Sequence, residues 1–159
     1  MLSCRFENQN DEYRFRHVTV DALMFNHEKQ LCLVKRSDSS IEEPSMYSFP
    51  GGFLELNETT IEGVLREVHE ETGYKAEVKR LFRINDDPSM AGNPNQNIEF
   101  FFIVEALNQI GQHDEEIDSV HWFDLNALPN KDDIAFNHAD VIDQYTEYLQ
   151  KPFDLPLFG

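Results

Sequence analysis

The sequence has few of the features that stabilise secreted or membrane-spanning proteins. Its two cysteines, Cys4 and Cys32, are too few for a disulfide framework and lack the close spacing of a zinc site. The longest uninterrupted apolar run, residues 100–104, is far too short to span a bilayer. Residues 1–11 lack the apolar core of a secretory signal. We therefore expect a soluble cytoplasmic protein with no membrane partner, in which Cys32 is a small buried hydrophobe.

Basic side chains are also scarce. The chain has 13 Lys and Arg against 30 Asp and Glu, so its formal net charge is −17. This balance counts against an open nucleic-acid-binding surface, because phosphate backbones are held by clustered Lys and Arg, and we expect no nucleic-acid partner. A phosphorylated substrate remains open if divalent cations lie between protein carboxylates and phosphate oxygens. The acidity does not predict disorder, because 40% of the residues are hydrophobic and 13 are Phe.

The length and the order of the predicted elements indicate one mixed domain. With 159 residues the chain has the usual size of a single domain. Alternating and β-branched stretches predict strands at 15–25, 30–35, 74–85, 96–107 and 116–124, the first two forming a hairpin through 26–29. Helical spacing predicts helices at 60–72 and 137–150. The fold class is therefore α/β (α+β), with an N-terminal arm (1–14), one domain (15–152) and an apolar C-terminal tail (153–159) that lies against the body or a partner.

The helix at 60–72 has clear signals at both ends. Thr59 followed three residues later by Glu62 has the form of a capping box, and Gly73 is a typical C-terminal stop. Its apolar residues share one face (Ile61, Leu65, Val68 and Thr72). Three carboxylates, Glu67, Glu70 and Glu71, span only an arc of about 100° on another face.

Three carboxylates so close together destabilise a bare helix, since like charges repel at this spacing. Hard oxygen ligands of this kind suit Mg²⁺, Mn²⁺ or Ca²⁺. Glu58, just before the helix, adds a fourth carboxylate, and Gly51-Gly52 permits a close approach of the backbone, so that a carbonyl could join a metal shell. For the three glutamates alone, a merely solvated helix face is the stronger interpretation.

The spacing of the whole segment favours the metal site. Gly52 and Glu58 are separated by five residues, and seven more precede Arg66-Glu67-Val68-His69-Glu70-Glu71-Thr72-Gly73-Tyr74. These 23 residues resemble the signature of the Nudix hydrolases at every fixed position. The resemblance implies a mixed β-sheet sandwiched between α-helices. It also implies hydrolysis of a diphosphate that joins a nucleoside to another group, with Mg²⁺ or Mn²⁺ as cofactor.

The resemblance assigns roles to the matching positions. It makes Glu70 and Glu71 metal ligands, and Glu67 either a ligand or the base that activates water. Arg66 would orient these carboxylates by charge-assisted hydrogen bonds.

The resemblance also gives roles at the metal site to Gly51, which precedes the signature, and to Glu58 within it. The Gly51 carbonyl would complete one metal's shell. Glu58 would be a further ligand or a structural partner of Arg66.

A glutamate outside the signature serves as the base in some members of the family, in the loop before the last strand. Here that loop contains Glu115 and Glu116. A solvated acidic turn is an equally good interpretation of either residue.

The substrate is not encoded in the signature. Arg36 and Arg83 could reach a phosphate and Tyr47 could stack on a base, although surface and core roles are the plainer alternatives. Pro88 lies 15 residues past Gly73, about where ADP-ribose pyrophosphatases of this family tend to carry a proline.

We therefore rank ADP-ribose or another nucleoside-diphosphate sugar first among small-molecule nucleotide substrates. Cleansing of oxidised or damaged nucleoside triphosphates is second, and dinucleotides such as NADH or dinucleoside polyphosphates are third. A nucleotide-binding sensor without catalysis is the less favoured alternative from another functional class. Many relatives are dimers, so a homodimer is left open.

Overall fold

The central sheet of the protein is mixed, and one helix covers each of its faces. The structure is a computed structural model, and it describes residues 2–5, 12–89 and 96–159. Neighbouring strands follow the order β10-β7-β8-β3-β4-β5, with β6 paired to β3 and β9 paired to β4. The strands are β3 (Val18–Phe25), β4 (Leu31–Arg36), β5 (Tyr47–Ser48), β6 (Gly51–Phe53), β7 (Tyr74–Asn85), β8 (Ile98–Gln109), β9 (Ile117–Phe123) and β10 (Leu157–Phe158).

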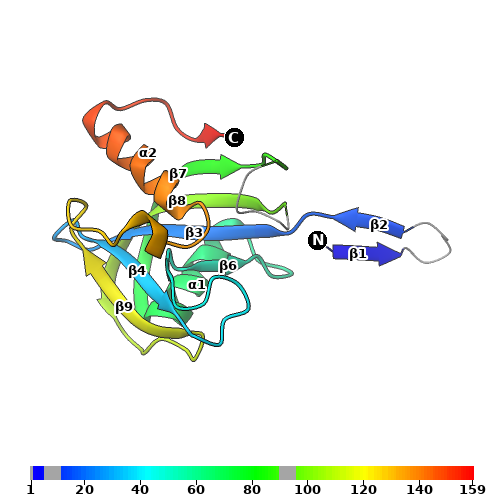
Figure 1. The fold of residues 1–159 in the computed structure, drawn as a ribbon, viewed down its shortest axis with the longest axis horizontal. Coiled ribbons are helices and arrows are strands. Elements are labelled where there is room, and N and C mark those ends of the chain that lie inside the picture. The colour runs from blue at the N-terminus through cyan, green and yellow to red at the C-terminus, as the bar shows by residue number, and fades with distance from the viewer. Residues whose placement is uncertain (1, 6–11, 90–95) are drawn as a thin grey trace.

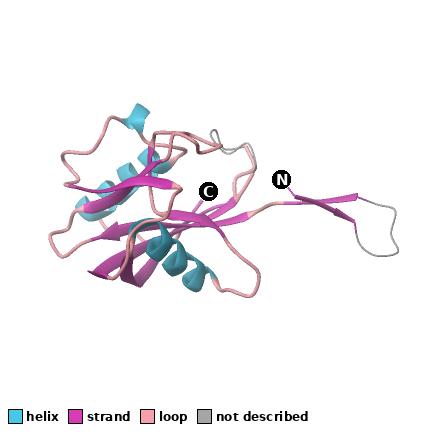
Figure 2. Ribbon diagram, turned by 90° about the horizontal axis from the view of Figure 1, so that it is seen from below, coloured by secondary structure: helices cyan, strands magenta, loops and turns pink. Residues whose placement is uncertain are grey.

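The two helices, α1 (Thr60–Thr72) and α2 (His138–Gln150), lie on opposite sides of this sheet (Figures 1 and 2). Alternate side chains of β3 divide between the two cores because successive strand residues point to opposite faces. Val20, Ala22 and Met24 pack in the core that contains Val64 and Val68 of α1. The core on the other face is built around α2, and its buried members from these two elements are Leu23, Phe25, Val141 and Ile142. The predicted sandwich of helices around a mixed sheet is confirmed.

The helix α1 begins and ends where its capping residues predict. The Thr59 hydroxyl accepts a hydrogen bond from the Glu62 N–H, and the Glu62 carboxylate accepts one from the Thr59 N–H. Gly73 ends the helix in the left-handed conformation, with φ at 71°, and its N–H donates to the His69 carbonyl. These signals are local, which is why the sequence alone located this helix.

The strand β6 was not expected, because Pro50-Gly51-Gly52 resembles a chain stop. Gly51 and Gly52 pair antiparallel with Asp21 and Val20 of β3. A Cβ atom on Gly51 would lie 2.4 Å from the Val20 carbonyl oxygen and 2.6 Å from Asp21 Oδ1. Glycine is therefore needed here for close approach to β3, and the glycine pair continues a strand instead of ending one.

The two ends of the chain also form strands. In the expected arm, β1 (Leu2–Arg5) and β2 (Glu12–Phe15) pair antiparallel, and the hairpin projects from the body (Figure 1). Residues 1 and 6–11 of that arm lie outside the described residues, as do residues 90–95 of the loop before β8. The apolar tail lies against the body, where β10 pairs parallel with β7.

The remaining elements are short. A single 3₁₀ turn, η1 (Lys131–Asp133), precedes α2. In the described ranges, no helix is long and apolar enough to cross a membrane.

Replacing Gly73 with Ala should destabilise the fold. Ala disfavours a positive φ, and its Cβ would lie 2.4 Å from the Gly111 carbonyl oxygen. We expect the free energy of unfolding to fall by about 2 kcal/mol, which is a fall in Tm of about 4–8 °C. Calorimetry of Gly73→Ala measures this. Gly111→Ala is the control, because nothing lies within 3.8 Å of its added Cβ; equal effects of the two variants would contradict the argument.

Candidate active site

An acidic cavity of about 410 Å³ opens between α1, β6, β3 and the segment that precedes α2. Two arginines, Arg36 and Arg66, are among its lining residues. The acidic residues that line it outnumber them (Asp21, Glu42, Glu55, Glu67, Glu70, Glu71, Glu99, Asp114 and Glu116). So many carboxylates would repel an anionic substrate unless cations accompany it.

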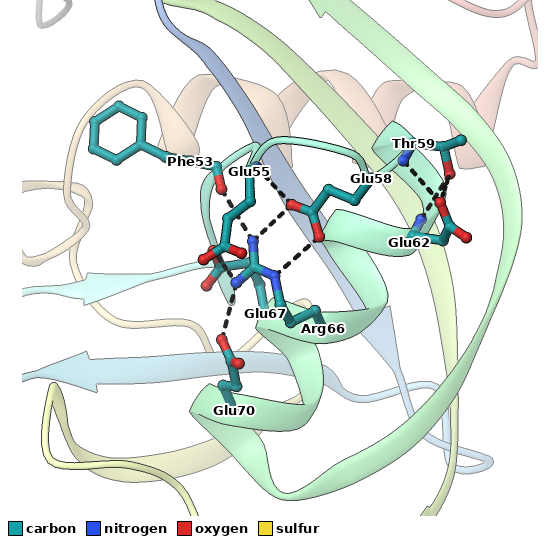
Figure 3. A network of polar contacts seen from close by, with 8 residues as sticks. All are labelled: Phe53, Glu55, Glu58, Thr59, Glu62, Arg66, Glu67 and Glu70. Atoms are coloured by element: carbon teal, nitrogen blue, oxygen red, sulfur yellow. Dashed lines mark hydrogen bonds and ion pairs between the residues drawn. The ribbon is translucent and has the colours of Figure 1, made fainter.

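Arg66 is the centre of the polar network on one wall of this cavity (Figure 3). Its Nε and Nη2 donate to the two oxygens of Glu58 at 3.1 and 2.9 Å. Its Nη1 donates to Glu67 and to Glu70, each at 2.9 Å, and Nη2 also donates to the Phe53 carbonyl at 3.1 Å. These bonds engage all five N–H groups of the guanidinium.

The hydrogen bonds of Arg66 shift the pKa values of the groups that they join, and each shift favours the charged form. Hydrogen bonds from Arg66 and from the Glu55 N–H lower the pKa of the Glu58 carboxyl. The same carboxylate partners raise the pKa of Arg66 further above its ordinary value. Both groups of this ion pair therefore stay charged over the whole physiological range. Of the two roles expected for Glu58, the structure shows the partner of Arg66.

Glu71 lies deeper than the other glutamates of α1 and is only 5% exposed. One of its oxygens accepts a hydrogen bond of 3.0 Å from the Gly51 N–H. Burial raises the pKa of Glu71 well above its ordinary value, and the charge of Glu67 raises it further. Burial also raises the pKa of Glu67, against the opposing effect of Arg66. Both carboxylates would therefore gain from a nearby cation.

Gly52 leaves room for the carboxylate of Glu67. A Cβ atom on Gly52 would lie 2.6 Å from Glu67 Oε1. Any side chain at this position would therefore displace Glu67, which explains a glycine in the signature here.

The donor set fits a hard divalent cation, because Glu67, Glu70 and Glu71 supply only oxygens from one helix. Arg66 holds Glu67 and Glu70 in this structure. Accordingly, no group of three or more His, Cys, Asp or Glu side chains in residues 2–5, 12–89 and 96–159 is already gathered as a metal site.

Two residues expected outside the signature line the cavity. Arg36 does so from the end of β4, and Glu116 from the loop before β9. The Asp114 N–H of that loop donates to the Glu70 carbonyl at 2.9 Å, which holds the loop against α1. Both Glu115 and Glu116 are exposed, but only Glu116 lines the cavity, and its charge contributes to the raised pKa of Glu67.

The other three residues expected to contact substrate lie away from the cavity lining. Arg83 is 5% exposed, and it donates to the Gly159 carbonyl at 2.9 Å and to Gln144 at 3.2 Å, so it holds the C-terminal segment. The Tyr47 ring packs edge-on against Phe123, and its backbone contacts the segment before α2. Pro88 is exposed in the loop after β7.

Several lining residues were not expected, and Asp21 and His138 are the most deeply placed. His138 Nδ1 accepts a hydrogen bond of 2.9 Å from the Phe49 N–H. Its Nε2 lies 3.6 Å from Asp21 Oδ1. Burial lowers the pKa of His138 to about 3, so its ring is neutral at physiological pH. A lone carboxylate in the apolar run of β3 was a usable signal for Asp21, whereas nothing local marks His138.

Comparison with known proteins agrees with this geometry. The family model of the NUDIX domain matches residues 15–145. The chain belongs to the Nudix hydrolase family. An ADP-ribose pyrophosphatase of Methanocaldococcus jannaschii is 30% identical over 132 residues, which cover 82% of this chain and 73% of that protein.

Two further relatives extend the comparison. The phosphatase NudJ of Escherichia coli K12 is 31% identical over 115 residues, covering 70% of this chain and 71% of NudJ. A NUDIX hydrolase from Nitrosomonas europaea has the same fold, with a TM-score of 0.77 and 24% identity over 92% of this chain and 79% of its own.

In the absence of metal, the variant Glu71→Gln should become more stable relative to the wild type as the pH rises. The folded-state pKa of Glu71 lies above the unfolded value, so the folded chain binds more protons between the two. The stability from protonated Glu71 is present below the unfolded pKa and is lost as pH rises through the folded one. Glu71→Gln removes that loss and keeps an acceptor for the Gly51 N–H.

With a chelator present, the Tm of Glu71→Gln minus that of the wild type should therefore increase as the pH rises from about 4, the ordinary value for Glu, into the neutral range. Thermal melts across that range measure it. Glu115→Gln, which neutralises an exposed carboxylate outside the cavity, is the control. A difference for Glu71→Gln that does not change with pH would show that this burial has no such cost.

Proposed function

We propose that this Nudix hydrolase is a metal-dependent pyrophosphohydrolase of a nucleoside diphosphate joined to another group, with ADP-ribose or an NDP-sugar as substrate. The observation that carries the proposal is the network in which Arg66 orients Glu67 and Glu70 on the wall of the acidic cavity. The relative in Methanocaldococcus jannaschii, named an ADP-ribose pyrophosphatase, supports the substrate class.

The cofactor in this proposal is Mg²⁺, with Mn²⁺ as the alternative. Glu70 and Glu71 would hold it together with the Gly51 carbonyl, and Glu67 is kept for the role of base. When bound, such a cation offsets the charge of the diphosphate and lowers the pKa of a coordinated water.

The chain's own residues orient the reacting groups. Arg66 fixes the direction of two carboxylates, and the Gly51 N–H fixes that of Glu71. Arg36 is the second cation of the cavity lining and would contact a phosphate. Glu67 is the proposed base, because it is held in one orientation and burial brings its pKa closer to neutrality.

A substrate panel tests the reaction. We expect ADP-ribose or an NDP-sugar to give the highest kcat/KM with Mg²⁺, above about 10⁴ M⁻¹s⁻¹. Phosphate release after coupling to a phosphatase measures it. The other substrates of the panel are NADH, dinucleoside polyphosphates, and normal and oxidised triphosphates. A triphosphate in first place would favour the cleansing reaction instead, and nucleotide binding without turnover would favour a sensor.

A second test separates the candidate bases. Glu67→Gln should lower kcat by about 10²–10⁴-fold and remove the acid limb of the pH–rate profile. Glu116→Gln should keep that limb and lose less than about tenfold in kcat. Glu115→Gln, one residue away but outside the cavity lining, should match the wild type. If Glu116→Gln removes the acid limb, the base is Glu116 and not Glu67.

A further inference from the structure

Phe136 has a backbone conformation that is unusual for an aromatic residue. Its φ is 56°, in the left-handed region, where a bulky side chain is strained. In the described ranges, the other non-glycine residues with positive φ are all polar (Lys29, Glu43, Ser45, Asn57 and Gln96). A strained conformation of this kind persists only where the surrounding structure enforces it, and it is concentrated at functional sites.

The residues on both sides of Phe136 hold it in place. Ile134, Ala135, Asn137 and His138 are buried, and the Ala135 N–H donates to the Tyr47 carbonyl at 2.7 Å. Phe136 itself is only half-buried and lines the acidic cavity. The ring is therefore presented to the cavity, although the chain around it is part of the core.

The neighbours of the ring indicate what it could bind. The Arg36 guanidinium carbon lies 5.3 Å from the ring centroid, within the range of a cation–π contact. Arg36 Nε also donates to the Glu42 carbonyl at 3.1 Å. A guanidinium thus lies over one face of an aromatic ring in a cavity otherwise rich in carboxylates. Of the parts of a nucleoside diphosphate, the base gains from the aromatic face and a phosphate from the guanidinium.

Both phenylalanines of the cavity lining contact a histidine ring, since the Phe136 centroid lies 5.4 Å from that of His138. The difference lies at Phe53, whose backbone belongs to the Arg66 network. Its carbonyl accepts a hydrogen bond from Arg66, and its ring centroid lies 4.9 Å from that of His17. Figure 3 shows the Phe53 ring directed away from Arg66 and the glutamates of α1.

We propose that Phe136 is the platform on which the nucleobase of the substrate stacks, with Arg36 beside it for the adjoining phosphate. The inference rests on the proposed function, because it presumes a nucleotide in this cavity. Phe136 would then determine specificity by separating nucleotide diphosphates from diphosphates that have no base.

The test compares a diphosphate that contains an adenosine with one that has no nucleoside. One is ADP-ribose, and the other is 5-phosphoribosyl 1-diphosphate, which has a diphosphate and a ribose but no base. For Phe136→Leu we expect KM for ADP-ribose to rise about tenfold with kcat within about twofold, as for the loss of one stacked base. The kinetics of the base-free diphosphate should not change. Phe136→Trp, which keeps an aromatic face, should retain the wild-type KM.

A stability measurement separates this role from core packing. Asn tolerates the left-handed region better than Phe, so Phe136→Asn should melt at or above the wild-type Tm, or within about 2 °C below it. A larger fall would show that the ring is structural and would overturn the proposal. Phe158→Leu, which truncates a ring that is 73% exposed on β10, is the matched control for both assays.

Failure of the platform and failure of the proposed function give different results. If the wild type hydrolyses neither diphosphate, the proposed reaction is wrong, and calorimetric binding of AMP to wild type and Phe136→Leu still tests the platform. About tenfold weaker AMP binding to the variant supports it. Equal binding, or an equal rise in KM for both diphosphates, overturns it.

Discussion

The five hydrogen bonds of the Arg66 guanidinium hold together the wall on which the rest of the site depends. Glu67 and Glu70 stand on the same face of α1, where like charges would otherwise repel. Arg66 offsets that repulsion at 2.9 Å from each. Its bonds to Glu58 and to the Phe53 carbonyl reach the loop before the helix and the strand β6. One side chain thus fixes a strand, a loop and a helix relative to one another.

The same wall contains groups that are unfavourable for the fold by themselves. Burial raises the pKa values of Asp21, Glu67 and Glu71, so each of them is ionised at a cost near neutral pH. A sequence selected only for stability would replace them. Their clustering around one cavity is the pattern expected of a functional site, and a bound cation would offset the cost. The strained backbone of Phe136, on the same cavity, follows this logic.

Close packing on both sides of β6 explains Gly51, which precedes the signature, and Gly52, which begins it. Gly51 faces Asp21 of β3, and Gly52 faces Glu67 of α1, each without space for a Cβ atom. The strand β6 therefore lies between β3 and the helix α1. Both contacts join segments that are distant in the chain. The sequence therefore showed that glycine permits a close approach here, but it did not predict the strand β6.

The sequence by itself determined the helix α1, its caps, the positions of the principal strands along the chain and the carboxylates of the signature. Those features depend on local rules, namely capping, helical periodicity and residue spacing. The tertiary structure decided which other residues reach the cavity. Arg83 and Glu115 were as plausible as Arg36 and Glu116 by composition, yet only the latter pair lines it.

Asp21, Phe136 and His138 join the cavity from segments far apart in the chain. The physical reason is that contacts between distant segments follow from strand register and helix packing, and neither is written in any short stretch of sequence.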